Sequence, residues 1–236
     1  MLTVRSDSSL PPRFTASTNL LVNNVVVPAL RRAIGAVLVL PGAVHLKATY
    51  HLDGHVPARF NPTTGEVISI DEPIVCFTEN HDVLCYVLTH ELAHYHELSL
   101  RRARQIRVMG NGPTQLWSEY FAQRVAWETS SIKSDSWPLA GGSEGVVEVA
   151  KEGGEAYSWA YMLTFMLAHA DAAPEMWLEA YPGKENFLRI FVSVLQEDGV
   201  SDRLFRSFPN WSKADADLAA MLFNGLLKFS RRHRPK

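Results

Sequence analysis

The sequence has few cysteines and no excess of charge of either sign. Among its 236 residues there are two cysteines, Cys76 and Cys85, too few for the disulfide framework of a small secreted domain. Both lie among apolar residues, so we expect small buried thiols. The 23 Lys and Arg residues and the 25 Asp and Glu residues leave a formal net charge of −2. A nucleic-acid binder usually carries a basic face, so we expect no nucleic-acid partner.

Long hydrophobic runs are also missing. The most apolar stretch, residues 20–40, is interrupted by asparagines, a proline and two arginines, and this excludes a membrane-spanning helix. The first 14 residues lack the apolar segment of a secretion signal. We therefore expect a cytoplasmic protein that has no membrane partner. Its 47% hydrophobic content is typical of a globular protein with a buried core.

What is present is a pattern of helices around one short β region. Residues 1–14 are predicted to form a flexible arm, followed by a helix over 19–39 that is kinked or split at Pro28. Alternating apolar residues and a turn at 61–65 predict a small, mostly antiparallel sheet over 44–77. Further helices are predicted over residues 79–104, 113–129, 144–152, 155–171, 184–197 and 213–230.

This order of elements indicates an α+β protein. We expect a catalytic region over residues 15–135 and a helical C-terminal region over 136–236 that packs on it, in one compact domain. The helix predicted over 79–104 follows the sheet directly and carries the one motif with clear chemistry.

The motif is Thr89-His-Glu-Leu-Ala-His94, in the middle of that predicted helix. His90 and His94 are four residues apart, so their side chains project from one face, one turn apart, and both imidazoles can bind one Zn²⁺ ion. Glu91 is turned by about 100° from His90. It is therefore a poor ligand of that ion, but it can take a proton from a zinc-bound water and pass it to a leaving amine. The alternative is a chance match, in which the histidines are ordinary surface or core residues.

A catalytic zinc ion usually has three protein ligands and one open position. The best candidate for the third ligand is Glu119, because a second helix packed against the first can present one carboxylate to the same ion. His96, Glu97 and Glu128 compete for this role. Glu97 lies about 10 Å along the helix axis from His90, which is too far for one ion. An exposed helix glutamate without a role is the alternative for Glu119.

Together, His90-Glu-Leu-Ala-His94 and Glu119-Tyr-Phe-Ala122 resemble the gluzincin class of metallopeptidases. The resemblance implies a zincin-like fold, a Zn²⁺ cofactor and a glutamate as the third ligand. In its compact size and its lack of a secretion signal, the sequence resembles the minimal intracellular members of the ImmA/IrrE-like group. One position departs from the thermolysin-like pattern, because Gln123 stands where an aspartate orients a ligand histidine. A glutamine carbonyl can accept the same imidazole N–H, but it raises ligand basicity less.

The resemblance also implies where the substrate lies and which groups stabilise the reaction. In such enzymes an edge strand pairs with the extended substrate, and residues 66–71 are the candidate. A plain internal strand is the alternative. A later helix often supplies an oxyanion-stabilising group. Tyr157 and Tyr161 share one helix face and are the catalytic candidates, although aromatic residues on a helix that is apolar nearly all round are more often core.

Three functions from different classes are compatible with these patterns. The first is a zinc metallopeptidase that hydrolyses a peptide bond in a peptide or protein substrate. The second is a non-catalytic, zincin-fold regulatory or interaction protein that binds zinc and a partner. The third is a helical interaction protein in which the motif arose by chance. Glu91 favours the first function, because a purely structural zinc site needs no base.

Overall fold

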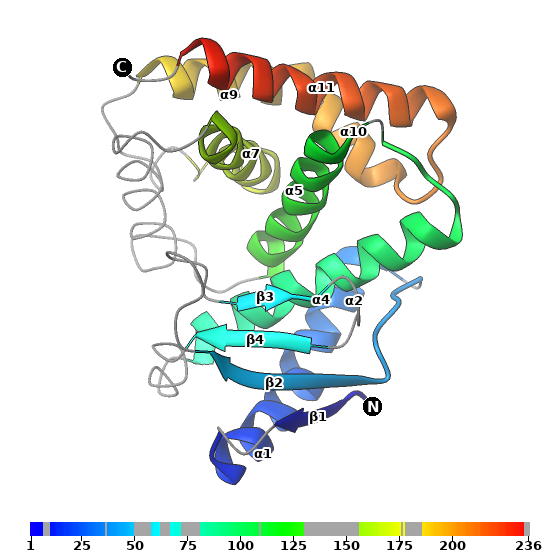
Figure 1. The fold of residues 1–236 in the computed structure, drawn as a ribbon, viewed down its shortest axis with the longest axis vertical. Helices are drawn as coiled ribbons and strands as arrows, with labels where there is room; N and C mark the ends of the chain where they lie inside the picture. The colour runs from blue at the N-terminus through cyan, green and yellow to red at the C-terminus, as the bar shows by residue number, and fades with distance from the viewer. Residues whose placement is uncertain are drawn as a thin grey trace.

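The computed structural model describes residues 1–6, 10–35, 37–49, 58–61, 67–71, 81–108, 110–129, 156–175, 177 and 186–233. Its strands are β1 (Thr3–Ser6), β2 (Ala43–Thr49), β3 (Ala58–Phe60) and β4 (Val67–Asp71). Its helices, in chain order, are α1 (Pro12–Leu21), the π-helical segment η1 (Val22–Val26), α2 (Val27–Ile34), α4 (His81–Ala103), α5 (Asn111–Thr129), α7 (Ala156–Ala172), α9 (Asn186–Asp198), α10 (Val200–Ser207) and α11 (Lys213–Arg232). Figure 1 shows the sheet at one end of the molecule and α9 and α11 at the other.

The four strands form one mixed sheet in the order β1-β2-β4-β3. β1 pairs with β2 and β2 pairs with β4 in parallel, and only β3 and β4 are antiparallel. The described part of the chain is mainly helical, so the prediction of an α+β, zincin-like fold with a mostly antiparallel sheet is wrong. Alternation along a strand shows which of its faces is buried but not the direction of its partner. Here one partner of β2 comes from the N-terminal segment, across the helices α1 and α2.

The first residues, for which the sequence predicts a flexible arm, contain the strand β1. Leu2 and Val4 are buried. Asn23 exchanges hydrogen bonds of 2.8 Å with the backbone N–H and C=O of Leu2. The side chain of Asn19, one turn earlier, accepts a hydrogen bond of 3.1 Å from the N–H of Val4. Two asparagine side chains thus bind β1, which is an edge strand of the sheet in the described part of the chain.

One continuous helical run, formed by α1, η1 and α2, connects β1 to β2. It covers residues 12–34 instead of the predicted 19–39, and its middle is a π-helical turn. Pro28 lies in the first turn of α2 and has no N–H to donate to the preceding turn. The wider turn before Pro28 accommodates the missing hydrogen bond without ending the helix. Gly35, with φ of 88°, ends the run in a conformation that favours glycine.

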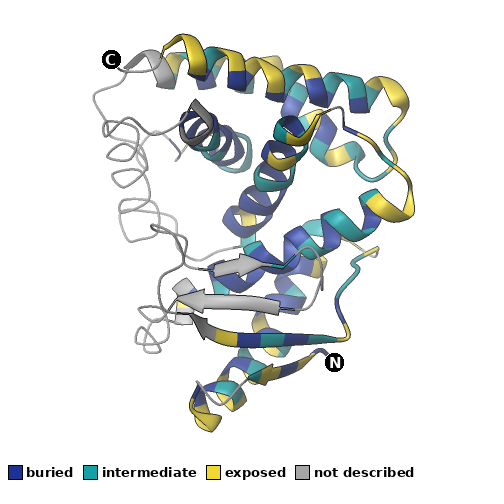
Figure 2. Ribbon diagram, in the orientation of Figure 1, coloured by how far each residue is buried: buried dark blue, intermediate teal, exposed yellow. Residues whose placement is uncertain are grey.

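The helix α5 is the centre of the helical part. It packs against α4, α7 and α11, and its Trp117 and Tyr120 side chains are fully buried. Figure 2 shows that α11 turns its buried residues towards α5 and α7 and its exposed residues outwards. Because α4 contacts both α5 and β3, it lies between the helical part and the sheet. The residues of α4 are therefore positioned from both sides.

Five of the predicted helices correspond to described ones, namely α4, α5, α7, α9 and α11. The short helix α10 was missed by the prediction. The helix predicted over 144–152 and Cys76 lie outside the described residues. Cys85 is a free thiol that is half-buried rather than fully buried. No helix in the described ranges combines the length and the apolar character needed to cross a membrane.

Candidate metal site

Three potential metal ligands come together where α4 packs against α5. His90 and His94 lie one turn apart on α4, and Glu119 projects from α5. Their ligand atoms all lie within 4.8 Å of one another, and no other group of three histidine, cysteine or carboxylate side chains does so among the described residues. The packing of two helices therefore brings together the three residues that the sequence suggests as ligands.

The distances among these atoms form a nearly equilateral triangle, called the ligand triangle below. The Nε2 atoms of His90 and His94 are 3.0 Å apart, and Oε2 of Glu119 lies 3.5 Å from each of them. In a tetrahedral site with zinc–ligand distances of about 2.0–2.1 Å, neighbouring ligand atoms are about 3.3 Å apart. The ligand triangle therefore has the size expected for three protein ligands of one zinc ion.

The three side chains are largely but not completely buried. Exposure is 13% for His90, 11% for His94 and 18% for Glu119. Burial lowers the pKa of His94, but the neighbouring carboxylates, Glu119 first among them, raise it from 6.5 to about 9. Burial raises the pKa of Glu119, but His94 and His90 lower it well below its ordinary value. Without a metal ion, His94 therefore holds a proton beside an ionised Glu119, and metal binding has to displace that proton.

The predicted base, Glu91, lies beside the ligands without being one of them. It is buried, and its negative charge contributes to the raised pKa of His94, which places the carboxylate near that ring. It does not belong to the group of converging ligand atoms, as its rotation of about 100° from His90 predicts.

The second ring nitrogen of His94 is held by a serine from α5. Nδ1 of His94 lies 2.9 Å from Oγ of Ser118, and the Ser118 hydroxyl donates a hydrogen bond of 3.1 Å to Oε2 of Glu97. This contact is absent from the sequence predictions, in which Glu97 appears only as a possible direct ligand. Two signals were present. Glu97 follows His94 by one turn on the same face, and Ser118 directly precedes Glu119.

Gln123 does not orient a ligand histidine, contrary to the interpretation from the resemblance. Its amide contacts the hydroxyl of Tyr86 and lies 2.9 Å from Nε2 of His169. All three side chains are buried, and the His169 ring stacks on Trp127 with ring centroids 4.2 Å apart. Gln123 therefore connects α5 to α4 and α7 inside the core.

The other three candidates for the third ligand have different partners. Nδ1 of His96 accepts a hydrogen bond of 3.0 Å from a backbone N–H. Glu97 forms an ion pair of 2.7 Å with Arg101, and Glu128 forms one of 3.0 Å with Arg124. None of the three belongs to the group of converging ligand atoms.

The two tyrosines suggested as oxyanion-stabilising groups both lie on α7. The side chain of Tyr157 lies outside the described residues. Tyr161 is partly buried and packs on Phe165, with ring centroids 5.5 Å apart. The Phe165 ring lies in turn 6.4 Å from the ring of His90. Tyr161 is thus connected to the ligands through one aromatic ring.

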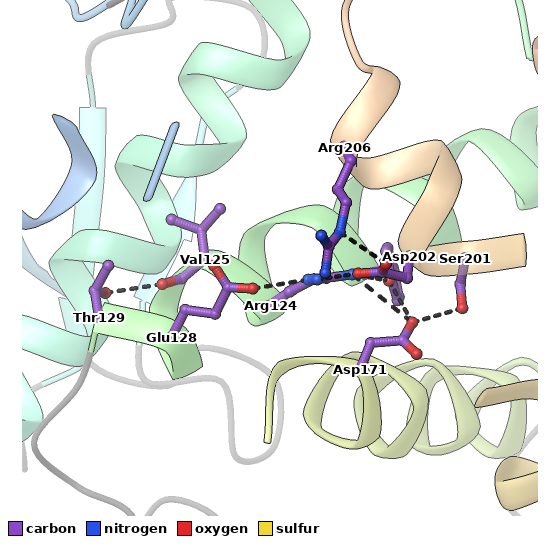
Figure 3. Close-up of polar contacts among 9 residues, drawn as sticks. Arg124, Val125, Glu128, Thr129, Asp171, Ser201, Asp202 and Arg206 are labelled. Atoms are coloured by element: carbon purple, nitrogen blue, oxygen red, sulfur yellow. Dashed lines mark hydrogen bonds and ion pairs between the residues drawn. The ribbon is translucent and has the colours of Figure 1, made fainter. Parts of the chain in front are cut away.

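A buried ion-pair network around Arg124 attaches α5 to two other helices. The guanidinium donates a hydrogen bond of 2.9 Å to the hydroxyl of Tyr120 and pairs with Asp202 on α10. It also lies 3.9 Å from Asp171 on α7, which accepts a hydrogen bond of 2.5 Å from Tyr120. Figure 3 shows Arg124 reaching from α5 towards both carboxylates. This network fixes the helix that carries Glu119.

The strand that was expected to receive the substrate is not open. β4 is paired with β2 on one side and with β3 on the other. The expectation of a substrate-binding edge at residues 66–71 is therefore wrong, and the alternative, an internal strand, is correct. The sequence shows that β4 precedes the metal-site helix, but only the pairing of all four strands shows which of them lie at the edges.

Two imidazole nitrogens and one carboxylate oxygen are a donor set that zinc and other first-row transition metals accept. No protein-family model, curated protein or solved structure matches the chain.

Proposed function

We propose that this protein is a zinc-dependent metallopeptidase that hydrolyses a peptide bond in a peptide or protein substrate. His90, His94 and Glu119 bind the ion, and Glu91 is the general base. The observation that carries the proposal is the ligand triangle. Its sides of 3.0, 3.5 and 3.5 Å are close to the spacing of about 3.3 Å between ligands of one zinc ion.

The number and type of donors favour a catalytic ion over a structural one. Structural zinc sites are usually closed by four ligands that include cysteine, whereas catalytic sites have three protein ligands and an open position. Among the described residues three ligand atoms converge, and Cys85 does not provide one of them. A zinc ion in such a site lowers the pKa of water and polarises carbonyl groups.

Glu91 provides the proton transfer that peptide hydrolysis requires. The attacking water has to lose a proton, and the leaving amine has to gain one. The carboxylate of Glu91 lies near His94 and can perform both transfers in turn. Tyr157 and Tyr161 are the candidates for stabilising the oxyanion, of which Tyr161 has the described connection to the site through Phe165.

The proposal concerns the site and does not require a zincin-like fold. The same catalytic arrangement of side chains occurs on unrelated folds, because chemistry depends on the geometry of the site residues. A ligand set of the gluzincin type can therefore be presented by two packed helices beside a mainly parallel sheet.

The proposed compartment is the cytoplasm. Cys85 is a free thiol, and reducing compartments keep thiols in this state. The substrate would then be a cytoplasmic peptide or protein.

A non-catalytic zinc-binding regulatory protein is the alternative function. The low exposure of the site favours it, because only 5% of Glu91 and 11% of the His94 side chain are accessible. A site this closed admits a metal ion more readily than a polypeptide. The two functions differ in the need for Glu91, since regulation by a bound metal requires no base.

Elemental analysis of the purified protein tests the metal site. We expect one zinc ion per chain in the wild type and strongly reduced zinc in Glu119→Ala, which lacks one of three ligands. Glu128→Ala is the matched control, because it removes another glutamate of α5 that pairs with Arg124 outside the site, and it should retain zinc. A wild type that stays metal-free when zinc is supplied, or that selects iron over zinc, contradicts the proposal.

A further inference from the structure

We infer that Ser118 and Glu97 are positioning residues for the metal ligand His94. Glu97 holds the hydroxyl of Ser118, and Ser118 holds the imidazole of His94 so that its Nε2 atom stays in the ligand triangle. The inference rests on the proposed function, because it names residues that prepare the same site for a metal ion. Neither residue is itself a ligand.

A chain of two hydrogen bonds connects the three side chains. Oγ of Ser118 lies 2.9 Å from Nδ1 of His94 and 3.1 Å from Oε2 of Glu97. His94 and Glu97 belong to α4, whereas Ser118 belongs to α5. The packing that brings Glu119 to the metal-binding side of His94 therefore also brings the preceding residue to the other side of the same ring.

The chemistry of the groups sets the direction of these hydrogen bonds. Glu97 is the ion-pair partner of Arg101, and an ionised carboxylate only accepts hydrogen bonds. The Ser118 hydroxyl must therefore donate to Glu97, and its oxygen is left to accept the N–H of His94. A neutral imidazole with its proton on Nδ1 has its lone pair on Nε2. The two hydrogen bonds thus select the tautomer of His94 that can bind a metal ion through Nε2.

Glu97 is itself held in one orientation. It is fully buried, and its carboxylate accepts hydrogen bonds from Arg101 at 2.7 Å, from the indole of Trp117 at 3.1 Å and from Ser118. A buried carboxylate is costly unless it is paired and hydrogen-bonded, and these three donors meet that requirement. A group bound from three directions can fix the hydroxyl of Ser118.

The other histidine lacks an equivalent support in the described part of the chain. Nδ1 of His90 is buried there without a hydrogen-bond partner. His94 is therefore the ligand whose ring is oriented before a metal ion arrives. Partners of this kind typically contribute about 10- to 100-fold to metal affinity, and in this protein we expect the whole effect to act through His94.

Zinc affinity, measured by competition with a chromogenic chelator, tests the inference. We expect Ser118→Ala and Glu97→Gln each to bind zinc about 10- to 100-fold more weakly than the wild type. Both residues act through the same series of hydrogen bonds to His94. The double variant should therefore lose no more zinc affinity than the more affected of the two single variants. Ser118→Thr keeps the hydroxyl and should retain most of the affinity.

Ser201→Ala is the matched control for the loss of a buried serine hydroxyl. Ser201 donates a hydrogen bond of 2.5 Å to Asp171, outside the ligand triangle, so this variant should bind zinc as the wild type does. Thermal unfolding of the metal-free variants shows that each is folded. Wild-type affinity in folded Ser118→Ala, or additive losses in the double variant, overturns the inference. A wild type that binds no zinc overturns the proposed function, and the inference with it.

Discussion

Glu91 and Glu119 lie beside the same pair of histidines, and the proposed function gives them different tasks. In that proposal Glu119 is the ligand, because its Oε2 atom is 3.5 Å from both imidazoles. Glu91 is the proposed proton carrier, and it does not belong to the group of converging ligand atoms. Glutamine at position 91 has nearly the same shape as glutamate but no longer accepts a proton. A single substitution therefore separates catalysis from metal binding.

We expect Glu91→Gln to retain one zinc ion per chain and to lower kcat/KM for peptide hydrolysis by about 10²- to 10⁴-fold, the usual contribution of a general base. Mass spectrometry of a mixed peptide library measures the cleavage, and elemental analysis of the same preparation measures the zinc. If the variant keeps the full biological activity of the wild type, the regulatory alternative is correct.

Two buried histidines outside the ligand triangle make the fold sensitive to acid. Burial lowers the pKa of His96 from 6.5 to about 4 and that of His169 from 6.5 to about 3. In the unfolded chain both take up a proton near their ordinary pKa, so the unfolded state binds more protons between these limits. Their contribution is fully present above pH of about 6.5 and is lost as the pH falls towards the folded values.

We therefore expect the free energy of unfolding of the metal-free protein to fall between pH of about 6.5 and 4.5. The slope approaches about 1.4 kcal/mol per pH unit for each histidine. Urea titrations at several pH values measure it. His96→Gln should show a smaller slope, because glutamine can still accept the backbone N–H but does not titrate. A stability that is constant over this range would show that the two histidines do not stay neutral in the fold.

At the scale of the helices, two glycines differ in whether their backbone conformation requires glycine. Gly199 separates α9 from α10 with φ of 66°, in the left-handed region. Gly225 lies within α11, and a Cβ atom built on it meets nothing within 4 Å. Position 199 needs the conformational freedom of glycine. At position 225 glycine brings no such benefit, and ordering its backbone in the helix costs more entropy than ordering alanine.

We expect Gly199→Ala to destabilise the protein by about 1–2 kcal/mol, because an L side chain is strained in the left-handed region. Gly225→Ala should stabilise it by about 0.5–1 kcal/mol, as alanine is the better helix former. Denaturant unfolding of both variants beside the wild type measures the two effects. If both substitutions changed the free energy of unfolding equally and with the same sign, the junction between α9 and α10 would not require glycine.

At the scale of the whole molecule, the network around Arg124 joins α5, α7 and α10. The Arg124 side chain is 3% exposed and that of Asp171 is 1% exposed, whereas Arg206, which also pairs with Asp202, is 74% exposed. Removing one partner of a buried ion pair leaves an uncompensated charge in the core. Removing an exposed partner leaves a charge that water can solvate.

We expect Arg124→Met to lower the free energy of unfolding by about 3–5 kcal/mol. Arg206→Ala is the matched control and should lower it by no more than about 1 kcal/mol. Chemical denaturation compares the two variants. A small effect at Arg124 would mean that the helices are held by apolar packing alone.

The core of the candidate site could be predicted from the sequence because it depends on helix geometry. Residues four apart on any helix present their side chains one turn apart. The placement of His90 and His94 on one helix face could therefore be predicted without knowledge of the fold. Glu119 required only that a second helix pack against the first. Its distance to the histidines, and the contact of Ser118 and Glu97 with His94, depend on how α5 is rotated against α4. That rotation is set by packing and by no local pattern.

The sequence by itself determined which segments of the described chain become the longer helices, because hydrophobic periodicity is a property of the local chain. The tertiary structure decided the direction and the order of the strands. Alternation in β2 is the same whether its neighbour runs parallel or antiparallel. The choice was made by the burial of Leu2 and Val4 in β1 and by the helical connection through α1 and α2, which returns the chain to the sheet in the same direction.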